Sequence, residues 1–395
     1  MVANQRESIS RIGASPPFDI EPGTSMEFSI GIGPNLRKSA YFDATVRDGV
    51  RSFSVYNHML IPGHFGDPEA EYDRLINGVA TWDVAAQRQV ELVGPDAGQL
   101  AQYLTSRNLS NTRIGQGRYV PLCDYDGWLI NDPVLLKLAE DKYWLSVADA
   151  DIHLWVAAIG KERGLDIRIH EPDVSPLAIQ GPKAVEVAAS LFGEDVRSMR
   201  HFAFAERELD GIPLVLARSG WSKQGGFELY LRDCTFGTKL WDLVKAAGAP
   251  FGIGPGAPND IERIESGLIS YGADMRRQTH RATPFEMGLG ALVDLSSGHD
   301  FVGRAALAEI AKNPPRRRRV GFMFAENPNP PGHAVPVLLD GNEVGYVSEF
   351  AFSKRLGKTI GVGLIATEYA ETQGRMVVQL DGEQHAVELS DLPFL

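Results

Sequence analysis

Two stretches of the chain share one pattern: VELVGPDAGQLAQYL at residues 90–104 and SPLAIQGPKAVEVAASLF at residues 175–192. Each begins with an apolar run of strand length, turns at Gly-Pro, and continues with apolar residues at helical spacing. In the first stretch, Asp96 is the predicted N-cap of the helix. We interpret the repeat as two related α/β units of one duplicated region. The alternative is chance recurrence of a common turn.

The rest of the chain is predicted to divide around these units. Residues 1–45 are expected to form an irregular lead-in, since prolines interrupt them. Residues 46–313 form the main region, with a predicted strand at 52–56 and predicted helices at 149–163, 241–247 and 259–270; Asn259 or Asp260 would cap the last helix. Residues 314–395 carry short apolar segments between Gly and Pro turns, which predict a small all-β domain with strands at 320–324, 334–339, 345–350, 359–364 and 376–380.

Composition excludes several classes of protein. The 395 residues include 39 Lys and Arg against 51 Asp and Glu, a formal net charge of −12, which argues against a nucleic-acid-binding protein. We expect the four basic residues at 316–319 to be a solvated strand edge rather than a phosphate site. Neither a signal-peptide pattern nor an apolar run of about 18 residues is present, so a cytoplasmic protein with no membrane partner is expected. Cys123 and Cys234 could pair, but they form no disulfide framework and no zinc motif.

The segment RSGWSKQGGFELY at residues 218–230 carries the densest functional signal. Its glycines suit a backbone that approaches another group closely or takes positive φ. Glu228 stands between aromatic residues, which suits a flat heterocycle: the rings stack on its face and the carboxylate accepts two N–H bonds from its edge. A pterin presents such an edge. The alternative is a hairpin with a solvent-facing glutamate and core aromatics.

Three further segments are candidates for site residues. In YNHMLIP (56–62), His58 is either an acid–base group or a structural histidine, and Met59 is a soft apolar contact. A helix end and loop follow at 104–119. In IERIESG (261–267), Arg263 either belongs to a solvated charge pattern or points inward and holds a carboxylate. The glycines at 252–256 form a connection more readily than a phosphate loop, and no metal-binding motif is evident, so we expect no metal.

With these segments in order, the sequence resembles the aminomethyltransferase (glycine-cleavage T-protein) superfamily from about Phe53 to Leu395. Within it, the phrases YNHML, RQVE, NDPV, ARSGWSKQGGFE, IERIESGL and DLPFL are most similar to the dimethylsulfoniopropionate demethylases. The resemblance implies an α+β fold, with a duplicated α/β folate-binding region around a central channel and a small C-terminal β-barrel domain. It also implies tetrahydrofolate as cofactor.

The resemblance assigns roles to particular residues. Glu228 takes the place of the pterin-binding glutamate, and Asn108 the place of the family's catalytic aspartate. Because asparagine is uncharged and cannot act as a general base, glycine-cleavage chemistry on an amine is disfavoured. The candidate catalytic residues are Asn108, Tyr56 and His58. The candidate cofactor-binding residues are Glu228, Trp221, Tyr230, Met59, Tyr119 and Arg263. The candidate substrate-binding residues are Lys223, Arg107 and Ser146.

Methyl transfer from a sulfonium is compatible with this replacement, because the leaving group departs as a neutral thioether. The task left to the protein is alignment of N5, methyl and sulfur, with Trp221 and Tyr119 as aromatic faces for the cation. We therefore expect a tetrahydrofolate-dependent demethylase that acts on a small methyl donor, dimethylsulfoniopropionate being favoured, as a monomer or homodimer. The alternatives are an O- or N-demethylase, a folate-independent lyase or hydratase, and a non-catalytic folate-binding protein.

Overall fold

The computed structural model describes residues 33–276, 278–371, 376–380 and 382–395, and the predicted lead-in falls largely outside them. The chain divides after Asn35, and the unit Leu36–Leu395 contains all the elements described below. Its first helix, α1 (Phe42–Arg47), begins inside the segment predicted to be irregular, which corrects that boundary.

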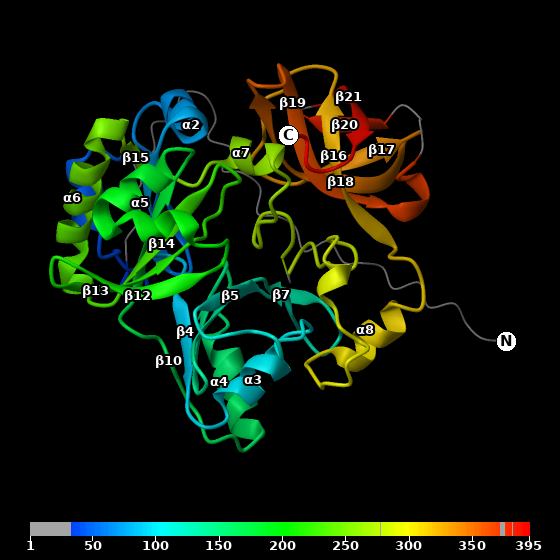
Figure 1. Ribbon diagram of the computed structural model, residues 1–395. Helices are drawn as coiled ribbons and strands as arrows, with labels where there is room; N and C mark the ends of the chain where they lie inside the picture. Colours follow the sequence, from blue (N-terminus) through cyan, green and yellow to red (C-terminus); the bar gives the residue numbers. More distant parts are fainter. Residues whose placement is uncertain (1–32, 277, 372–375, 381) are drawn as a thin grey trace. The chain divides into compact units, whose positions relative to one another are not determined.

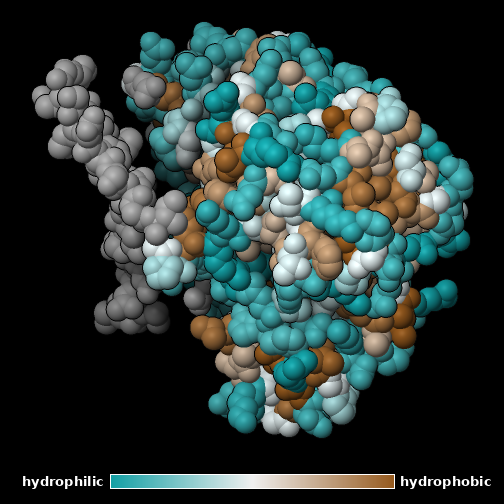
Figure 2. All heavy atoms as spheres, turned by 90° about the vertical axis from the view of Figure 1, so that its left-hand side faces the viewer, coloured by the Kyte–Doolittle hydropathy of each residue, from teal (hydrophilic) through white to brown (hydrophobic). Residues whose placement is uncertain are grey.

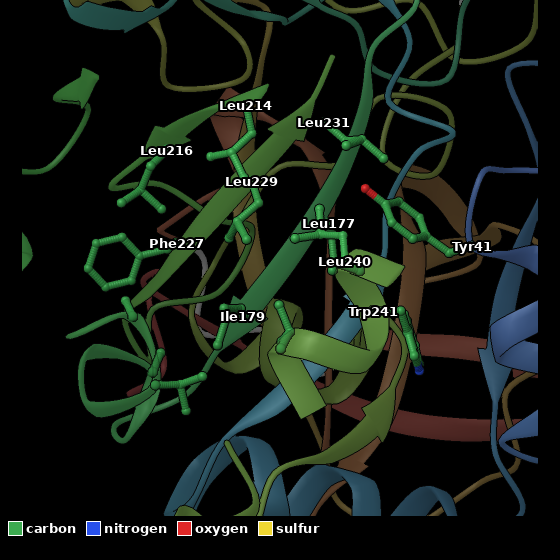
Figure 3. Close-up of a cluster of buried hydrophobic side chains, with 14 of the residues drawn as sticks. Tyr41, Leu177, Ile179, Leu214, Leu216, Phe227, Leu229, Leu231, Leu240 and Trp241 are labelled. Atoms are coloured by element: carbon green, nitrogen blue, oxygen red, sulfur yellow. The ribbon is translucent and has the colours of Figure 1, made fainter. Parts of the chain in front are cut away.

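A six-stranded sheet and the two helices packed on it form the first pair of layers. The strand order is β12-β13-β14-β11-β3-β15. The bounds are β3 Ala80–Asp83, β11 Ser175–Gln180, β12 Phe204–Leu209, β13 Ile212–Ala217, β14 Gly226–Leu231 and β15 Gly254–Gly256. Helices α5 (Ala184–Phe192) and α6 (Gly237–Gly248) cover one face. Figure 3 shows Leu177, Leu229 and Leu231 of the sheet beside Leu240 and Trp241 of α6.

A five-stranded sheet repeats this arrangement with helices α3 (Ala97–Leu104) and α4 (His153–Glu162) on its outer face. The strand order is β10-β4-β9-β8-β5, and Figure 1 labels three of these strands, β4, β5 and β10. The bounds are β4 Gln89–Val93, β5 Gln116–Tyr119, β8 Val134–Ala139, β9 Lys142–Ser146 and β10 Arg168–His170. Side chains alternate along β8, so Leu135 packs under the helices while Leu136 points to the opposite face.

The two inner sheet faces meet in one apolar cluster. Leu136 and Trp144 from the five-stranded sheet pack with Val215, Ala217 and Tyr230 from the six-stranded sheet. The rings of Trp144 and Tyr230 lie 6.1 Å apart. Each sheet therefore buries both faces, one under helices and one against the other sheet.

The predicted strand, Gly-Pro turn and helix occur at both positions, as β4–α3 and β11–α5. Glycine is required at both turns because the backbone takes positive φ there and because a Cβ atom would collide with neighbouring backbone. Gly94 has φ 143° and Gly181 has φ 121°, and a Cβ at Gly181 would lie 2.5 Å from the carbonyl oxygen of Gly78. Asp96 is the N-cap residue of α3, as predicted, but its side chain accepts from the backbone N–H of Asp166 and makes no bond to its own helix.

Gly181→Ala is expected to lower the free energy of unfolding by about 2–3 kcal/mol, because the new methyl group meets backbone that cannot move aside. Gly164→Ala is the matched control: its φ is also positive, at 66°, but no atom lies within 4 Å of the added Cβ. We expect the control to cost about 1 kcal/mol. Urea-induced unfolding of the two variants compares them, and equal losses would contradict the steric explanation.

Several short elements lie outside the two large sheets and the C-terminal domain. They are β1 Ser52–Tyr56, β2 Met59–His64, α2 Pro68–Asn77, β6 Leu122–Cys123, β7 Leu129–Asn131, α7 Asp260–Glu265 and α8 Arg304–Ile310. Asn259 caps α7 as predicted, since its side chain accepts from the backbone N–H of Glu262. The helix is shorter than predicted because Gly267 takes φ 63°. The glycine segment at 252–256 includes β15, which pairs with β3 in parallel.

The C-terminal domain is a closed barrel in the order β16-β19-β18-β17-β20-β21 (Figure 1). Its bounds are β16 Arg317–Phe324, β17 Val335–Leu339, β18 Asn342–Ser353, β19 Lys358–Ala366, β20 Met376–Leu380 and β21 Glu383–Ser390. Five strands were predicted and β21 was not. The expected solvated edge at 316–319 holds for Arg316, which is exposed, and Arg318, which is 40% exposed, but not for Arg317 and Arg319, which bond to Glu286 and to the Gly267 carbonyl.

Apolar residues on the surface are scattered. Figure 2 shows one face on which hydrophilic residues surround separate apolar groups. Cys123 and Cys234 are both free thiols, so the pairing left open above does not occur. Within the described residues, no helix is both long and apolar enough to cross a membrane.

Candidate functional site

A row of paired residues on the five-stranded sheet defines the centre of the site. Tyr119 of β5 pairs with Val134 of β8, and Val134 pairs with Ser146 of β9. Neighbouring strands lie about 4.8 Å apart, so the two ends of this row are about 10 Å apart. Burial raises the pKa of Tyr230 and the neighbouring Ser146 side chain acts against this, so Ser146 lies beside Tyr230 and joins the row to the six-stranded sheet.

Glu228 stands next to this junction on β14. Its carboxylate is 5% exposed and accepts from the Ser219 hydroxyl and, at 3.3 Å, from the Tyr230 hydroxyl. Both bonds reach Oε2, and no donor among the described residues contacts Oε1. Burial raises the pKa of Glu228 above its ordinary value. The carboxylate is thus held in one orientation with an acceptor to spare, which corrects the solvent-facing alternative.

The loop before β14 is organised by Gln180. Gly220 has φ 153°, and a Cβ there would fall 2.0 Å from Nε2 of Gln180; at Gly226 the same distance would be 2.2 Å. The amide of Gln180 also donates to the Ser219 carbonyl and accepts from the Ser222 hydroxyl. The glycines therefore permit a close approach, as predicted, and the group approached is a side chain of β11.

The same loop positions Trp221 and exposes Lys223. The Trp221 indole donates to the Ile269 carbonyl at 3.2 Å, which ties the loop to the segment after α7. The backbone N–H of Lys223 donates to Glu262, whereas its ammonium lies in solvent with no ion pair among the described residues. Lys223 as a substrate-binding residue stays a prediction.

The β1–β2 hairpin presents Tyr56 and Asn57 through a tight turn. Asn57 and His58 have φ 48° and 61°, the left-handed pair typical of a two-residue hairpin turn. Asn57 is buried: its backbone N–H donates to Asp149 and its amide to the Ala148 carbonyl, both at 2.9 Å. Its Oδ1 is buried and accepts no hydrogen bond from the residues that the structure describes.

The two residues after this asparagine differ in burial. His58 is exposed, so the structure places it neither in the core nor in a buried hydrogen-bond network. Met59 is 7% exposed and packs in the cluster beneath α5 and α6. Their predicted catalytic and folate-contacting roles stay predictions.

A buried carboxylate that the sequence analysis did not select, Asp132, lies at the other end of the row. It is 8% exposed and accepts from the Tyr119 hydroxyl at 2.7 Å. Burial is the largest cause that raises its pKa to about 7, and the nearby Asp274 carboxylate adds to the shift. The signal in the sequence was a polar pair, Asn131-Asp132, between a strand and Pro133.

Asn131, unlike Asp132, bonds to backbone groups of the segment at 148–150. It is fully buried, donates to the carbonyls of Ala148 and Ala150, and accepts from the backbone N–H of Ala148. Since Asn57 also bonds to the Ala148 carbonyl, Asn131 holds the segment that supports the hairpin turn.

Asp132→Asn is expected to stabilise the free protein more at high pH than at low pH. A carboxyl whose pKa is raised in the folded state holds its proton more tightly there, so stability is lost as pH rises from about 4 towards 7. Asparagine removes this cost. Urea unfolding should show that the variant's advantage grows by about 2–3 kcal/mol between pH 5 and pH 8. A difference independent of pH would contradict the assignment.

The polar ends of Asn108 bond to Asp294, far along the chain, and to the backbone of its own loop, and its catalytic role stays a prediction. Its amide donates to Asp294 at 3.0 Å and its carbonyl accepts from the Ser110 backbone N–H. Arg107 donates to the Tyr119 carbonyl at 2.7 Å, and burial and the neighbouring Arg118 lower its pKa. Arg107 thus lies beside the row, while Asn108 is engaged outside it.

Arg263 is fully buried in an ion-pair network between α7, the following loop and the barrel. Its guanidinium bonds to Asp274 at 3.1 Å, to Glu349 and to the Leu268 carbonyl. Arg319 adds a second cation to Asp274, and the two arginines lower the pKa of that carboxylate. The inward alternative for Arg263 is confirmed, and its direct contact with a cofactor stays a prediction.

These contacts bring together Glu228, Tyr230, Ser146, Tyr119, Asp132 and Tyr56, with Trp221 on the adjoining loop. In the described ranges, no three His, Cys, Asp or Glu side chains are arranged to hold a metal ion. The arrangement offers a fixed carboxylate acceptor at one end of a short row and a buried carboxylate among tyrosines at the other.

Comparison with known proteins gives consistent matches along the chain. The GCVT N-terminal domain matches residues 41–297, and the glycine cleavage T-protein C-terminal barrel domain matches residues 317–395. The chain is 42% identical over 348 residues to dimethylsulfoniopropionate demethylase DmdA from Ruegeria pomeroyi, covering 88% of this chain and 94% of that protein. It is 30% identical over 350 residues to an aminomethyltransferase from Saccharopolyspora erythraea, covering 87% and 94%.

A solved structure supports the fold. The glycine cleavage system aminomethyltransferase T from Bartonella henselae superposes with a TM-score of 0.79 at 22% sequence identity, covering 91% of this chain and 98% of that one. The expected fold class, a mixed α/β region followed by a closed barrel, is confirmed. On the family matches over both regions, the chain is a member of the glycine-cleavage T-protein family.

Proposed function

We propose that this protein is a tetrahydrofolate-dependent demethylase that transfers a methyl group from a small methyl donor, with dimethylsulfoniopropionate favoured, to N5 of the folate. The observation that carries the proposal is the orientation of Glu228. Its Oε2 is held by Ser219 and Tyr230, and its Oε1 has no donor among the described residues. The amino and ring N–H groups of a pterin supply such donors.

The residues around Glu228 fit a pterin. Trp221 is half-buried and fixed by the Ile269 carbonyl, which leaves an aromatic face at the edge of the site. Tyr230 is buried and its hydroxyl donates to Oε2 of Glu228, so it helps to orient the carboxylate. Bound folate would supply the nucleophilic N5, and the residues of this chain would hold and align it.

The reaction balances without a protein nucleophile. The S–CH₃ bond breaks and its electron pair remains on sulfur as a neutral thioether, the N5–CH₃ bond forms, and the N5 proton leaves to solvent. The task of the protein is therefore alignment and exclusion of water. The row between Ser146 and Tyr119, about 10 Å long, suits a folate ring at one end and a small donor at the other.

The experiment is product analysis with and without tetrahydrofolate. We expect the purified protein and dimethylsulfoniopropionate to yield 5-methyltetrahydrofolate and the methylthio acid only when folate is present. Turnover without folate would favour the lyase alternative. Folate binding with no turnover of any sulfonium, quaternary amine or methoxy donor would favour a folate-binding protein.

A further inference from the structure

Asp132 is a buried carboxylate that the proposed function leaves unassigned. No cationic side chain of the described residues forms an ion pair with it, and none contributes to its pKa. The nearby Asp274 is also a buried carboxylate, but its charge is compensated, since Arg263 and Arg319 both pair with it. A buried anion without a cation is costly, and it is retained where a ligand supplies the missing charge.

The surroundings of Asp132 are aromatic and polar. The Tyr119 hydroxyl donates to it, and Tyr56 lies close enough that the carboxylate raises the pKa of that phenol. Aromatic faces and one carboxylate together suit a compact cation that has no N–H to donate. A sulfonium or a quaternary ammonium is such a cation, and a methoxy group is not.

The position of Asp132 relative to Glu228 fits a donor beside a folate. Tyr119 holds Asp132 at one end of the row, and Ser146 meets Tyr230, next to Glu228, at the other. The two carboxylates thus flank the same strip of sheet and do not share a partner. One is placed for the methyl acceptor and the other for the donor.

We propose that Asp132 is the charge partner of the methyl donor and restricts the substrate class to donors that carry a positive charge at the reacting methyl group. The proposal rests on the proposed function and narrows it. Attraction to Asp132 ends when the methyl group leaves, because the thioether product is neutral. Asp132 is therefore a specificity residue, and its loss is expected to raise KM for the donor more than it lowers kcat.

The charged groups that face Asp132 set the pH dependence of donor binding. They are Tyr119 on β5, Tyr56 on β1 and Asp274 on the segment after α7; Arg319 on β16 acts on Tyr119 and Asp274. Since the free carboxyl has a pKa of about 7, donor affinity should rise as pH increases from 6 to 8. Binding near pH 7 should also release a proton.

The test compares two ligands of nearly equal shape in a binding assay that needs no turnover. Dimethylsulfoniopropionate carries the cation, and 4-methylpentanoate replaces the sulfonium with a neutral CH group. At pH 8 we expect the wild type to bind the sulfonium at least 10-fold more tightly, and Asp132→Asn to reduce this ratio to about 1–3. Asp149→Asn is the matched control, because Asp149 also acts on Tyr56 but is exposed. Its ratio should stay within about twofold of wild type.

Each outcome decides the proposal. A ratio unchanged in Asp132→Asn would overturn it, as would equal loss of both ligands, which would mean a structural role. If neither ligand binds, the same comparison is made with 4-(trimethylammonio)butanoate and 5,5-dimethylhexanoate. A wild type that binds the neutral member of that pair at least as tightly, or that binds neither, overturns the proposal. The proposed function fails separately, by absence of folate methylation with any donor.

Discussion

Glu228→Ala is expected to weaken tetrahydrofolate binding about 100-fold and to reduce methyl transfer to the detection limit at micromolar folate. A hydrogen bond to a charged group contributes about 1.5–3 kcal/mol, so losing two from the pterin edge costs about 3 kcal/mol or more. Isothermal titration calorimetry measures the folate affinity. Affinity for the methyl donor should change by less than threefold, because Asp132 lies at the far end of the row.

The pH dependence of folate binding tests the contact with Glu228 a second time. Burial raises the pKa of Glu228, so the carboxylate is neutralised at a higher pH than usual and wild-type folate binding should weaken as pH falls from 7 towards 5. Glu228→Gln should bind weakly and without this dependence. Glu208→Gln, an exposed glutamate on β12, is the matched control. Folate affinity of Glu228→Ala within threefold of wild type would refute the pterin assignment.

Arg263→Met is expected to lower the free energy of unfolding by about 3–5 kcal/mol. Removing one partner of a buried ion pair leaves an uncompensated charge: of the cations in the described residues, Asp274 would keep Arg319 but Glu349 would keep none. Because Glu349 on β18 also bonds to Arg263, the loss should loosen the barrel from α7. Urea-induced unfolding followed by tryptophan fluorescence measures the effect.

A double variant separates the structural role of Arg263 from a folate contact. Arg263→Met with Glu349→Gln removes the cation together with the carboxylate that it would leave unpaired, while Asp274 keeps Arg319, and we expect it to recover about 1 kcal/mol or more of the lost stability. Its folate affinity should then lie within threefold of wild type. Recovered stability with folate binding still lost would instead show that Arg263 contacts the cofactor.

Local pattern was enough to predict much of the fold. The two strand, Gly-Pro and helix units were visible because apolar spacing and a steric need for glycine act within a few residues. Five of the six barrel strands were visible for the same reason. The sixth, Glu383–Ser390, alternates weakly, with only Val387 fully buried, so pairing with β16 and β20 defines it.

The site was predictable where one segment contains both the group and its support. Glu228, Ser219 and Tyr230 lie within twelve consecutive residues. Asp132 was missed because its candidate role depends on burial, on partners from other strands and loops, and on the lack of an ion pair with any cation of the described residues. Similarly, nothing local distinguishes Asn131, which holds the backbone at 148–150, from a residue that faces a ligand.

Contacts between residues far apart in the sequence also explain why some charged side chains are buried where solvent exposure was expected. Four consecutive arginines suggested a solvated edge, but Arg319 reaches Asp274, 45 residues away in sequence, and Arg317 reaches Glu286. Glu262, Arg263 and Glu265 have the spacing of a surface helix, yet all three are buried where α7 meets loops and the barrel. Charge patterns alone do not show which carboxylates the fold brings to them.

The most direct measurement of the central claim follows the methyl group itself. Dimethylsulfoniopropionate with two CD₃ groups is incubated with the protein and one equivalent of unlabelled tetrahydrofolate, and the folate is analysed by mass spectrometry. We predict 5-methyltetrahydrofolate that carries all three deuterium atoms, with an equal amount of CD₃-thio acid. Consumption of the sulfonium without a labelled folate would contradict the account.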